Sequence, residues 1–286
     1  MSDSDALHRF LFEGTQVRGE LVHLDASWRA VLTRHPYPET VRGPLGEALA
    51  ATVLLTGTLK FDGALILQIQ GEGPLRTLVA QATHGRTIRG LARWEGQVPA
   101  GTIEAVFGPG RLVLTLEPER GERYQGIVPL FGANLAEALE TYFRTSEQLG
   151  TRLWLAAGPE RAAGLLLQRL PESHGAEEDW TRVVTLADTL TPEELTGLPT
   201  ETLLHRLFHE ENLRLFEGEP VAFRCTCSHQ RAVETIASLG ADDVQHLVDT
   251  LGSTAVTCHF CGTRHEMSLL DLFGILERLG RPQSRN

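Results

Sequence analysis

The sequence is poor in several features, and each shortage excludes a class of protein. Its longest apolar stretches, such as residues 49–57, fall far short of the ~18 residues that a membrane-spanning helix needs. The first ten residues, MSDSDALHRF, lack the basic segment and apolar run of a signal peptide. We therefore expect a cytoplasmic protein with no membrane partner.

Basic residues are outnumbered, with 26 Lys and Arg against 37 Asp and Glu, and the net charge is −11. The excess is uneven: residues 172–219 hold 12 acidic and 3 basic residues, whereas residues 220–286 hold 7 and 6. No segment is basic enough to neutralise a phosphate backbone, so we expect no nucleic-acid partner.

Cysteine is scarce, and its placement is informative. The chain has four, and all lie in its last quarter, as Cys-x-Cys and Cys-x-x-Cys. Thiols stay reduced in the cytosol, where clustered cysteines more often bind metal or do redox chemistry than form structural disulfides.

Residues 1–171 show both helical and strand patterns. Alternating apolar residues predict strands over 63–73, 110–119 and 121–130, the last two pairing with each other, and two strands with a turn over 154–170. Helical spacing predicts helices over 43–58 and 135–148, the second begun by Asn134 and Glu137. We expect an α+β core domain with a mostly antiparallel sheet.

Residues 172–219 form a different kind of segment. A polar stretch opens it, and a capping box of Thr191 and Glu194 then predicts a short helix over 191–199, with a second, amphipathic helix over 200–212. Helices this short are marginal alone, and a net charge of −9 makes the segment repel itself. It is either a conditionally folded linker or an ordinary acidic connector.

Residues 220–286 read as a small third module. Ser228 can cap a helix over 229–239, Asp242 or Asp243 can begin another, and Ser268 with Asp271 begins a last one. Between them, residues 254–260 read as a strand that enters the Cys-x-x-Cys-Gly turn.

The cysteine spacing predicts a metal site. Side chains two apart in a strand point to the same face, so Cys225 and Cys227 can reach one ion together, and the Cys-x-x-Cys turn brings Cys258 and Cys261 to the same place. Four thiolates match a closed tetrahedral zinc site. Two local disulfides or an iron–sulfur cluster use the same residues and remain alternatives.

Three histidines lie near these cysteines, but with four sulfurs available we expect them to be surface groups or neighbours of the ligands: His229, His259 and His265. The pattern of zinc deaminases is missing near the cysteines, since no proline precedes Cys258 and His265 is followed by Glu266 without the spacer of His-x-Glu. We expect no enzyme.

Such a zinc site would govern the fold of its module. Structural zinc contributes about 10–16 kcal/mol in small fingers, against ~5–15 kcal/mol for a whole domain. A Cys-x-Cys disulfide closes a small, strained ring, which would stay reduced in a healthy cytosol and form under stress. That favours a redox switch, although an inert zinc ribbon fits the spacing as well.

Over nearly its full length the chain resembles the 33-kDa heat-shock protein family of redox-regulated bacterial chaperones. The resemblance is carried by motifs along the chain and by all four cysteines: LHRFLFEGTQVRGELV (7–22), LLTGTLKFDGALILQIQGEGP (54–74), GERYQG (121–126), YFRTSEQLGTRLWL (142–155), TLTPEELTGLP (189–199), FHEENLRLFE (208–217), FRCTCS and CHFCG.

The resemblance implies a mechanism. Reduced protein would hold one zinc ion through Cys225, Cys227, Cys258 and Cys261 and be inactive. Oxidation would form the disulfides Cys225–Cys227 and Cys258–Cys261, release zinc, unfold the module at 220–286 and destabilise the linker at 172–219. The protein would then dimerise and hold unfolding client proteins without ATP, until other chaperones refold them.

Two other classes remain open from the residues alone. One is a zinc-ribbon regulatory protein that binds nucleic acid or a protein partner, against which the balanced charge of residues 220–286 argues. The other is a thiol enzyme, which would turn over disulfides while keeping its zinc.

Overall fold

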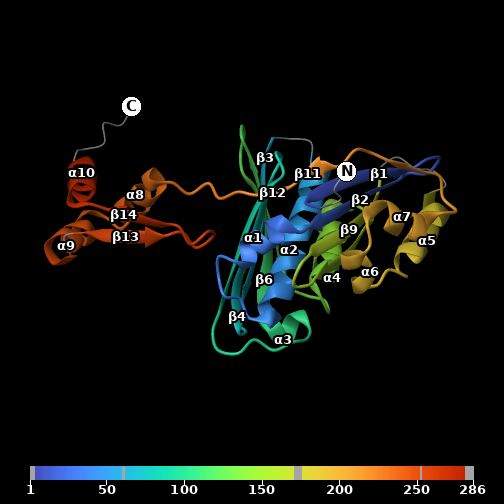
Figure 1. The fold of residues 1–286 in the computed structure, drawn as a ribbon, viewed down its shortest axis with the longest axis horizontal. Helices are drawn as coiled ribbons and strands as arrows, with labels where there is room; N and C mark the ends of the chain where they lie inside the picture. Colours follow the sequence, from blue (N-terminus) through green and yellow to red (C-terminus); the bar gives the residue numbers. More distant parts are fainter. Residues whose placement is uncertain (1–3, 60–61, 171–175, 252, 281–286) are drawn as a thin grey trace. The chain divides into compact units, whose positions relative to one another are not determined.

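A computed structural model describes residues 4–59, 62–170, 176–251 and 253–280. The chain divides into two compact units, Met1–Arg224 and Cys225–Asn286 (Figure 1). Each unit has its own apolar core. They are described separately.

The first unit contains two six-stranded sheets, here called sheet A and sheet B. Sheet A has the order β10-β1-β2-β9-β8, with β11 also paired to β1, and every pairing is antiparallel. Its strands are β1 (Ala6–Phe12), β2 (Val17–Leu24), β8 (Thr151–Ala157), β9 (Ala162–Arg169), β10 (Leu213–Leu215) and β11 (Glu219–Pro220).

Sheet B has the order β12-β5-β4-β3-β6-β7 and is antiparallel except for the β12–β5 pair. Its strands are β3 (Gly63–Gly71), β4 (Leu75–Thr83), β5 (Thr87–Trp94), β6 (Gly110–Pro118), β7 (Tyr124–Pro129) and β12 (Ala222–Phe223). Both sheets therefore take their last strands from the end of the unit, just before the cysteines.

The helices of the first unit fall into two groups. The first group precedes residue 148 and consists of α1 (Ala26–Leu32), α2 (Glu39–Thr58), α3 (Ile103–Phe107), α4 (Leu135–Tyr142) and a π-helical turn, η1 (Phe143–Glu147). The second group follows β9 in sequence and consists of α5 (Ala176–Ala187), α6 (Pro192–Gly197) and α7 (Thr200–Phe208).

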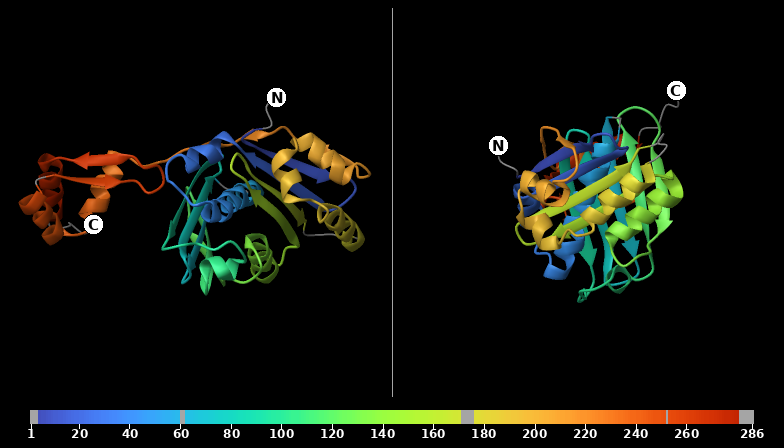
Figure 2. Two further views of the ribbon diagram at one scale, coloured as in Figure 1. Left: turned by 60° about the horizontal axis from the view of Figure 1, so that its bottom comes forward. Right: turned by 90° about the vertical axis from the view of Figure 1, so that its right-hand side faces the viewer.

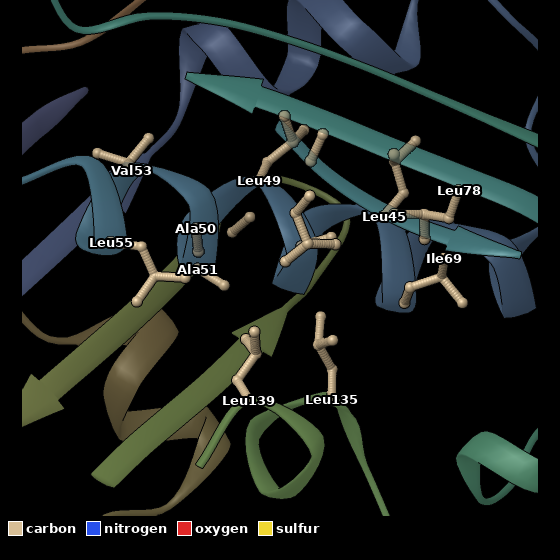
Figure 3. Close-up of a cluster of buried hydrophobic side chains, with 14 of the residues drawn as sticks. Leu45, Leu49, Ala50, Ala51, Val53, Leu55, Ile69, Leu78, Leu135 and Leu139 are labelled. Atoms are coloured by element: carbon tan, nitrogen blue, oxygen red, sulfur yellow. The ribbon is translucent and has the colours of Figure 1, made fainter. Parts of the chain in front are cut away.

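Helix α2 lies between the two sheets and is apolar on nearly all sides. Leu45, Leu49 and Leu54 are fully buried, and α4 adds Leu139 from a third direction (Figure 3). Glycines let the strands approach closely: a Cβ at Gly90 of β5 would lie 3.1 Å from Leu49, and one at Gly164 of β9 would lie 2.8 Å from Leu54. This two-sheet sandwich around one helix is the main core of the unit.

The other face of sheet A is covered by α5, α6 and α7 (Figure 2). Phe208 of α7 packs edge-on against Phe12 of β1, with ring centroids 4.9 Å apart. The shared core also contains Phe10, Leu165 and Leu167 from the sheet. Apolar side chains of α5–α7 and of the strands therefore hold these three helices on sheet A.

The second unit is small. It consists of α8 (His229–Ala237), α9 (Ala241–Leu251), the hairpin β13 (Thr254–Thr257) and β14 (Arg264–Met267), and α10 (Leu269–Gly280). Ser228 accepts a hydrogen bond from the Arg231 N–H, and Ser268 and Asp271 cap α10 reciprocally. Its core is seven buried side chains: Ala232, Val233, Ile236, Val244, Met267, Leu272 and Ile275.

The α+β fold with antiparallel sheets is confirmed, and so is the pairing of the strands predicted over 110–119 and 121–130. One difference is the number of sheets, because the prediction had a single sheet. A second is the start of α2 at Glu39 rather than residue 43, since Pro44 is accommodated inside the helix. The helix predicted over 135–148 is α-helical only to Tyr142.

The segment predicted as a linker also differs. Its opening was predicted as a polar connection, but α5 begins at Ala176, while residues 171–175 lie outside the described residues. Acidic residues in its first turn suit a helix N-terminus, and Val183, Val184 and Ala187 bury against sheet A. The capping box of Thr191 and Glu194 is confirmed.

One carboxyl of the first unit is buried without a partner for one of its oxygens. Glu20 of β2 is 2% exposed, and its Oε2 has no hydrogen bond. Burial raises its pKa to about 8, although the positive charges of Arg18, Arg86 and Arg9 act in the opposite direction. Glu20 therefore keeps its proton at neutral pH.

We expect Phe208→Ala to loosen α5–α7 from sheet A. Removing a buried phenylalanine costs about 3–5 kcal/mol of stability. Denaturation followed by circular dichroism should give a lower midpoint, and a dye that binds apolar surface should fluoresce before the main transition. Phe131→Ala is the control, because Phe131 is 67% exposed. Equal effects of the two substitutions would contradict this account of the core.

The burial of Glu20 also predicts how the free energy of unfolding depends on pH. Its pKa is raised in the folded state, so the folded protein binds more protons than the unfolded chain between about pH 4.5 and pH 8. The free energy of unfolding should therefore fall as pH rises through this range, by a few kcal/mol. Glu20→Gln should reduce this slope in urea titrations at several pH values. An unchanged slope in the variant would show that Glu20 ionises normally.

Candidate metal centre

Four cysteines meet at one end of the second unit, near the hairpin β13–β14. Cys258 directly follows β13, and Cys261 lies in the turn before β14. The turn is closed by backbone bonds from the Cys258 N–H to the Thr263 carbonyl and from the Gly262 N–H to the Cys258 carbonyl. Gly262 has a φ of 72°, a left-handed conformation that glycine adopts without strain.

Cys225 and Cys227 reach the same point from the start of the unit. The sequence predicted them in a strand, but β12 ends at Phe223 and the two cysteines lie in an irregular segment before α8. Their place outside a sheet leaves the backbone of this segment without ladder hydrogen bonds. The prediction that the two sulfurs approach one point still holds, because all four sulfurs cluster.

The sulfurs have the spacing of a tetrahedral site. Cys225 Sγ lies 3.6 Å from Cys258 Sγ, and Cys227 Sγ lies 3.4 Å from Cys261 Sγ. All four sulfurs lie within 4.8 Å of one another, and all four cysteines are free thiols. Bonds of ~2.3 Å from one central ion to four sulfurs would separate them by about 3.8 Å. The four cysteines can therefore hold a metal ion.

The electrostatics of the cluster also favour a cation. Burial and the neighbouring thiols raise the pKa of Cys227. Burial also raises the pKa of Cys258, against hydrogen bonds from the N–H groups of Cys261 and Phe260. Four thiolates so close together would repel one another strongly, and an ion at their centre would remove that cost because it stabilises each thiolate.

Cys261 differs from Cys227 and Cys258. Burial acts to raise its pKa, but the hydroxyl and the backbone N–H of Thr263 and the thiols of Cys227 and Cys225 lower it to about 6. The Thr263 hydroxyl lies 3.2 Å from the Cys261 sulfur. Sequence reasoning did not single out Thr263, and only its position two residues after a cysteine could have suggested it.

The histidines near the cysteines do not join the cluster, whose ligating groups among the described residues are cysteines alone. His229 is half exposed, and its Nε2 lies 3.3 Å from Asp271 Oδ1 at the start of α10. His265 lies on β14, opposite Val256 of β13. The expectation that sulfur alone would supply the ligand atoms is consistent with this arrangement.

The search for a membrane-spanning segment found none: within residues 4–59, 62–170, 176–251 and 253–280, every helix is too short or too polar to cross a bilayer.

Comparison with known proteins gives consistent matches. A family model described as Hsp33 protein matches residues 5–268. A 33 kDa chaperonin of Nitrosococcus oceani is 55% identical over 272 residues, which are 95% of this chain and 94% of the relative. A 33 kDa chaperonin of Azotobacter vinelandii is 48% identical over 280 residues, which are 95% of this chain and 94% of that protein.

The fold also has a counterpart of known structure. The crystal structure of a 33 kDa chaperonin from Thermotoga maritima superimposes with a TM-score of 0.82 and covers 96% of this chain and 98% of its own. At 23% identity this likeness concerns the fold. With the family model and the close relatives, it leads to one assignment: the chain belongs to the Hsp33 family of chaperones.

Proposed function

We propose that this protein is a redox-regulated, ATP-independent holdase, inactive while its four cysteines bind one zinc ion. The observation that carries the proposal is the position of the thiol cluster. It directly follows the segment whose helices cover the apolar face of sheet A. A chemical change at the thiols can thus reach a segment whose displacement would uncover apolar surface.

Zinc is the ion that best suits this ligand set. Closed sites of four thiolates are typical of structural zinc, although iron also binds such sets. Within the described residues the core of the second unit is small, so we expect its fold to depend on a bound metal ion. Zinc binding worth about 10–16 kcal/mol would supply that stability.

Oxidation would remove the ligands, because a disulfide sulfur is no longer a thiolate. The family resemblance implies the pairs Cys225–Cys227 and Cys258–Cys261. In the reduced arrangement all four sulfurs lie within 4.8 Å of one another, so each proposed pair is already close, as are Cys225 with Cys258 and Cys227 with Cys261. Both proposed disulfides could therefore form within the cluster, and together they would leave no thiolate to hold zinc.

The linker is the proposed second step. We propose three functional segments: a core at 1–171, a metastable linker at 172–219 and a redox module at 220–286. Loss of the module would release α5–α7 and expose the side chains of sheet A that they cover, Phe10 and Phe12 among them. That face would then bind unfolding client proteins, prevent their aggregation and pass them to chaperones that refold them.

Several further properties belong to the proposal. We propose that the protein acts in the cytoplasm during oxidative stress, forms a homodimer when oxidised, has no catalytic activity and binds neither nucleic acid nor membranes. The acidic balance of the chain supports the absence of a nucleic-acid partner.

A second candidate function is that of a zinc-ribbon module that binds a protein partner. The exposed apolar side chains of α10 favour it, since Leu270 is 83% and Phe273 52% exposed. In that case zinc would be permanent, and the partner would bind the reduced protein.

The decisive experiment treats reduced, zinc-loaded protein with hypochlorous acid. We expect zinc to appear in solution as thiols are lost, followed by suppression of the thermal aggregation of an unrelated protein. Peptide mapping would then identify the disulfides formed. Zinc release without any effect on aggregation would refute the holdase proposal, and retention of zinc would favour the partner-binding alternative.

Cys258→Ser should weaken the metal site even in the reduced protein. A hydroxyl is a poor zinc ligand, so the variant should contain less than one zinc ion per chain and lose the thermal transition of residues 225–286. Metal analysis and calorimetry measure both. Thr257→Ser, at the exposed neighbouring position, is the matched control. Normal zinc content in Cys258→Ser would exclude Cys258 as a required ligand.

A further inference from the structure

Residues 212–224, the last of the first unit, form a strap along the edges of both sheets. On sheet A the strap runs antiparallel to β1 from one end of that strand to the other. The N–H of Glu13 donates to the Asn212 carbonyl at one end, and the N–H of Val221 donates to the Asp5 carbonyl at the other, each at 2.7 Å. On sheet B its final part, β12, pairs with β5. The strap therefore covers the edge of β1 and ends directly before the first cysteine.

Main-chain groups and alternate side chains hold the strap in place. Between its ends, the N–H of Phe216 donates to the carbonyl of Arg9 at 2.9 Å, and β10 and β11 pair with β1 on either side. Leu213 and Leu215 pack against the core that α5–α7 share with sheet A, and the side chain between them is exposed. Val221 is buried in the main core. Sheet edges accept extended polypeptides in this way, because main-chain bonds give affinity and alternate side chains fill apolar sites.

The pairing of the strap with β1 is interrupted. Leu215 pairs with Phe10, and Glu219 pairs with Leu7. Three residues of the strap therefore lie opposite two residues of β1, which is the arrangement of a β-bulge, and a bulge leaves one residue unpaired. Gly218 lies in the bulge, where a Cβ would approach a side chain of β1 to 2.5 Å. A regular strand could therefore pair with β1 more completely than the strap does.

Glu219 anchors the strap electrostatically. It pairs with Arg9 of β1 and with Arg86, whose Nε lies 2.7 Å from its carboxylate. Arg86 is 7% exposed, so removing Glu219 would leave a buried cation without this partner. Glu217 lies on the same strap two residues earlier, but its side chain is exposed. The two carboxylates therefore offer one substitution that should loosen the strap and a matched one that should not.

We propose that the strap occupies the edge of β1 in place of a client, and that an extended segment of an unfolding protein pairs with β1 once the strap leaves. The proposal rests on the proposed function, which supplies the event that releases the strap. After release, the main-chain N–H and C=O groups along this edge of β1 would lack their partners in the sheet. The fitting occupant is a strand with free main-chain amides and an apolar side chain at every second position. This surface is the edge of sheet A, and it is distinct from the face that α5–α7 cover.

A labelled peptide with the sequence of residues 212–224 is a suitable probe, since it contains no cysteine. Fluorescence anisotropy should show that it binds the oxidised whole chain about tenfold more tightly, or better, than the reduced, zinc-loaded chain, whose own strap competes with it. N-methylation at Phe216 and Val221 removes two hydrogen bonds to sheet A and should weaken binding about tenfold or more. N-methylation at Leu215 is the matched control and should cost at most about twofold, because alternate residues of an antiparallel strand point their N–H away from the partner.

Two substitutions test the strap without oxidation. In the reduced, zinc-loaded chain, Glu219→Ala should raise the hydrogen-exchange rates of the Phe216 and Val221 amides about tenfold or more and strengthen binding of the peptide. Glu217→Ala is the matched control and should leave both measurements within about twofold of the unsubstituted protein. Should Glu219→Ala fail to fold, the oxidised chain and the methylated peptides decide alone.

Competition connects the edge with clients. The peptide should displace a client from the oxidised chain and so restore the client's aggregation, whereas the doubly methylated peptide should not. If the oxidised chain prevents aggregation but the peptide does not compete, or all methylated forms bind alike, the proposal about β1 is wrong and the holdase function stands. If the peptide dissociates oxidised dimers and leaves clients bound, β1 pairs two copies, and the proposal is likewise overturned. An oxidised chain that binds the peptide yet prevents no aggregation would refute the holdase function, and client pairing with it.

Discussion

The structure depends on the need to cover both faces of sheet A. Its strands are apolar in both directions: Leu7 and Val22 point to the core around α2, and Phe10 and Leu21 point the opposite way. A sheet buried on both faces needs a layer on each side. Helix α2 and sheet B supply the inner layer, and among the described residues α5–α7 supply the outer one. The segment before the cysteines is therefore a structural layer of the core.

The chain between this layer and the thiols is held by short strands. β10 has three residues, and β11 and β12 have two each. Glu219 of β11 adds ion pairs to Arg9 and to the buried Arg86, whose Nε lies 2.7 Å away. Short edge strands of this kind open at low cost compared with a core. Disorder that begins at Cys225 would thus meet its weakest resistance in the direction of α7.

Many elements of the fold could be predicted from local sequence patterns. The elements that could not be predicted depend mostly on contacts between residues distant in sequence. Thr191 with Glu194 and the alternating strand at 110–118 have local causes, so they were predictable. Helix α5 was not predictable, because its first turn is polar and its apolar residues are stabilised only by packing against the distant strands of sheet A. The three short strands were missed for the same reason. The four cysteines were predictable because their spacing brings thiolates together.

The many carboxylates of the segment 172–219 contribute less to the stability of the fold than their number suggests. Several of its carboxylates form ion pairs with arginines, such as Asp188 with Arg152 and Glu211 with Arg182, but the partners are partly exposed and such pairs contribute ~0–1 kcal/mol each. The linker is therefore held mainly by burial of apolar side chains such as Leu203, Leu207 and Phe208. In the proposed released state the charge would matter more, because a segment of net −9 would have fewer nearby arginines and would resist collapsing back onto the sheet. Apolar contacts thus hold α5–α7 on sheet A, whereas charge would favour the extended state that the proposed activation requires.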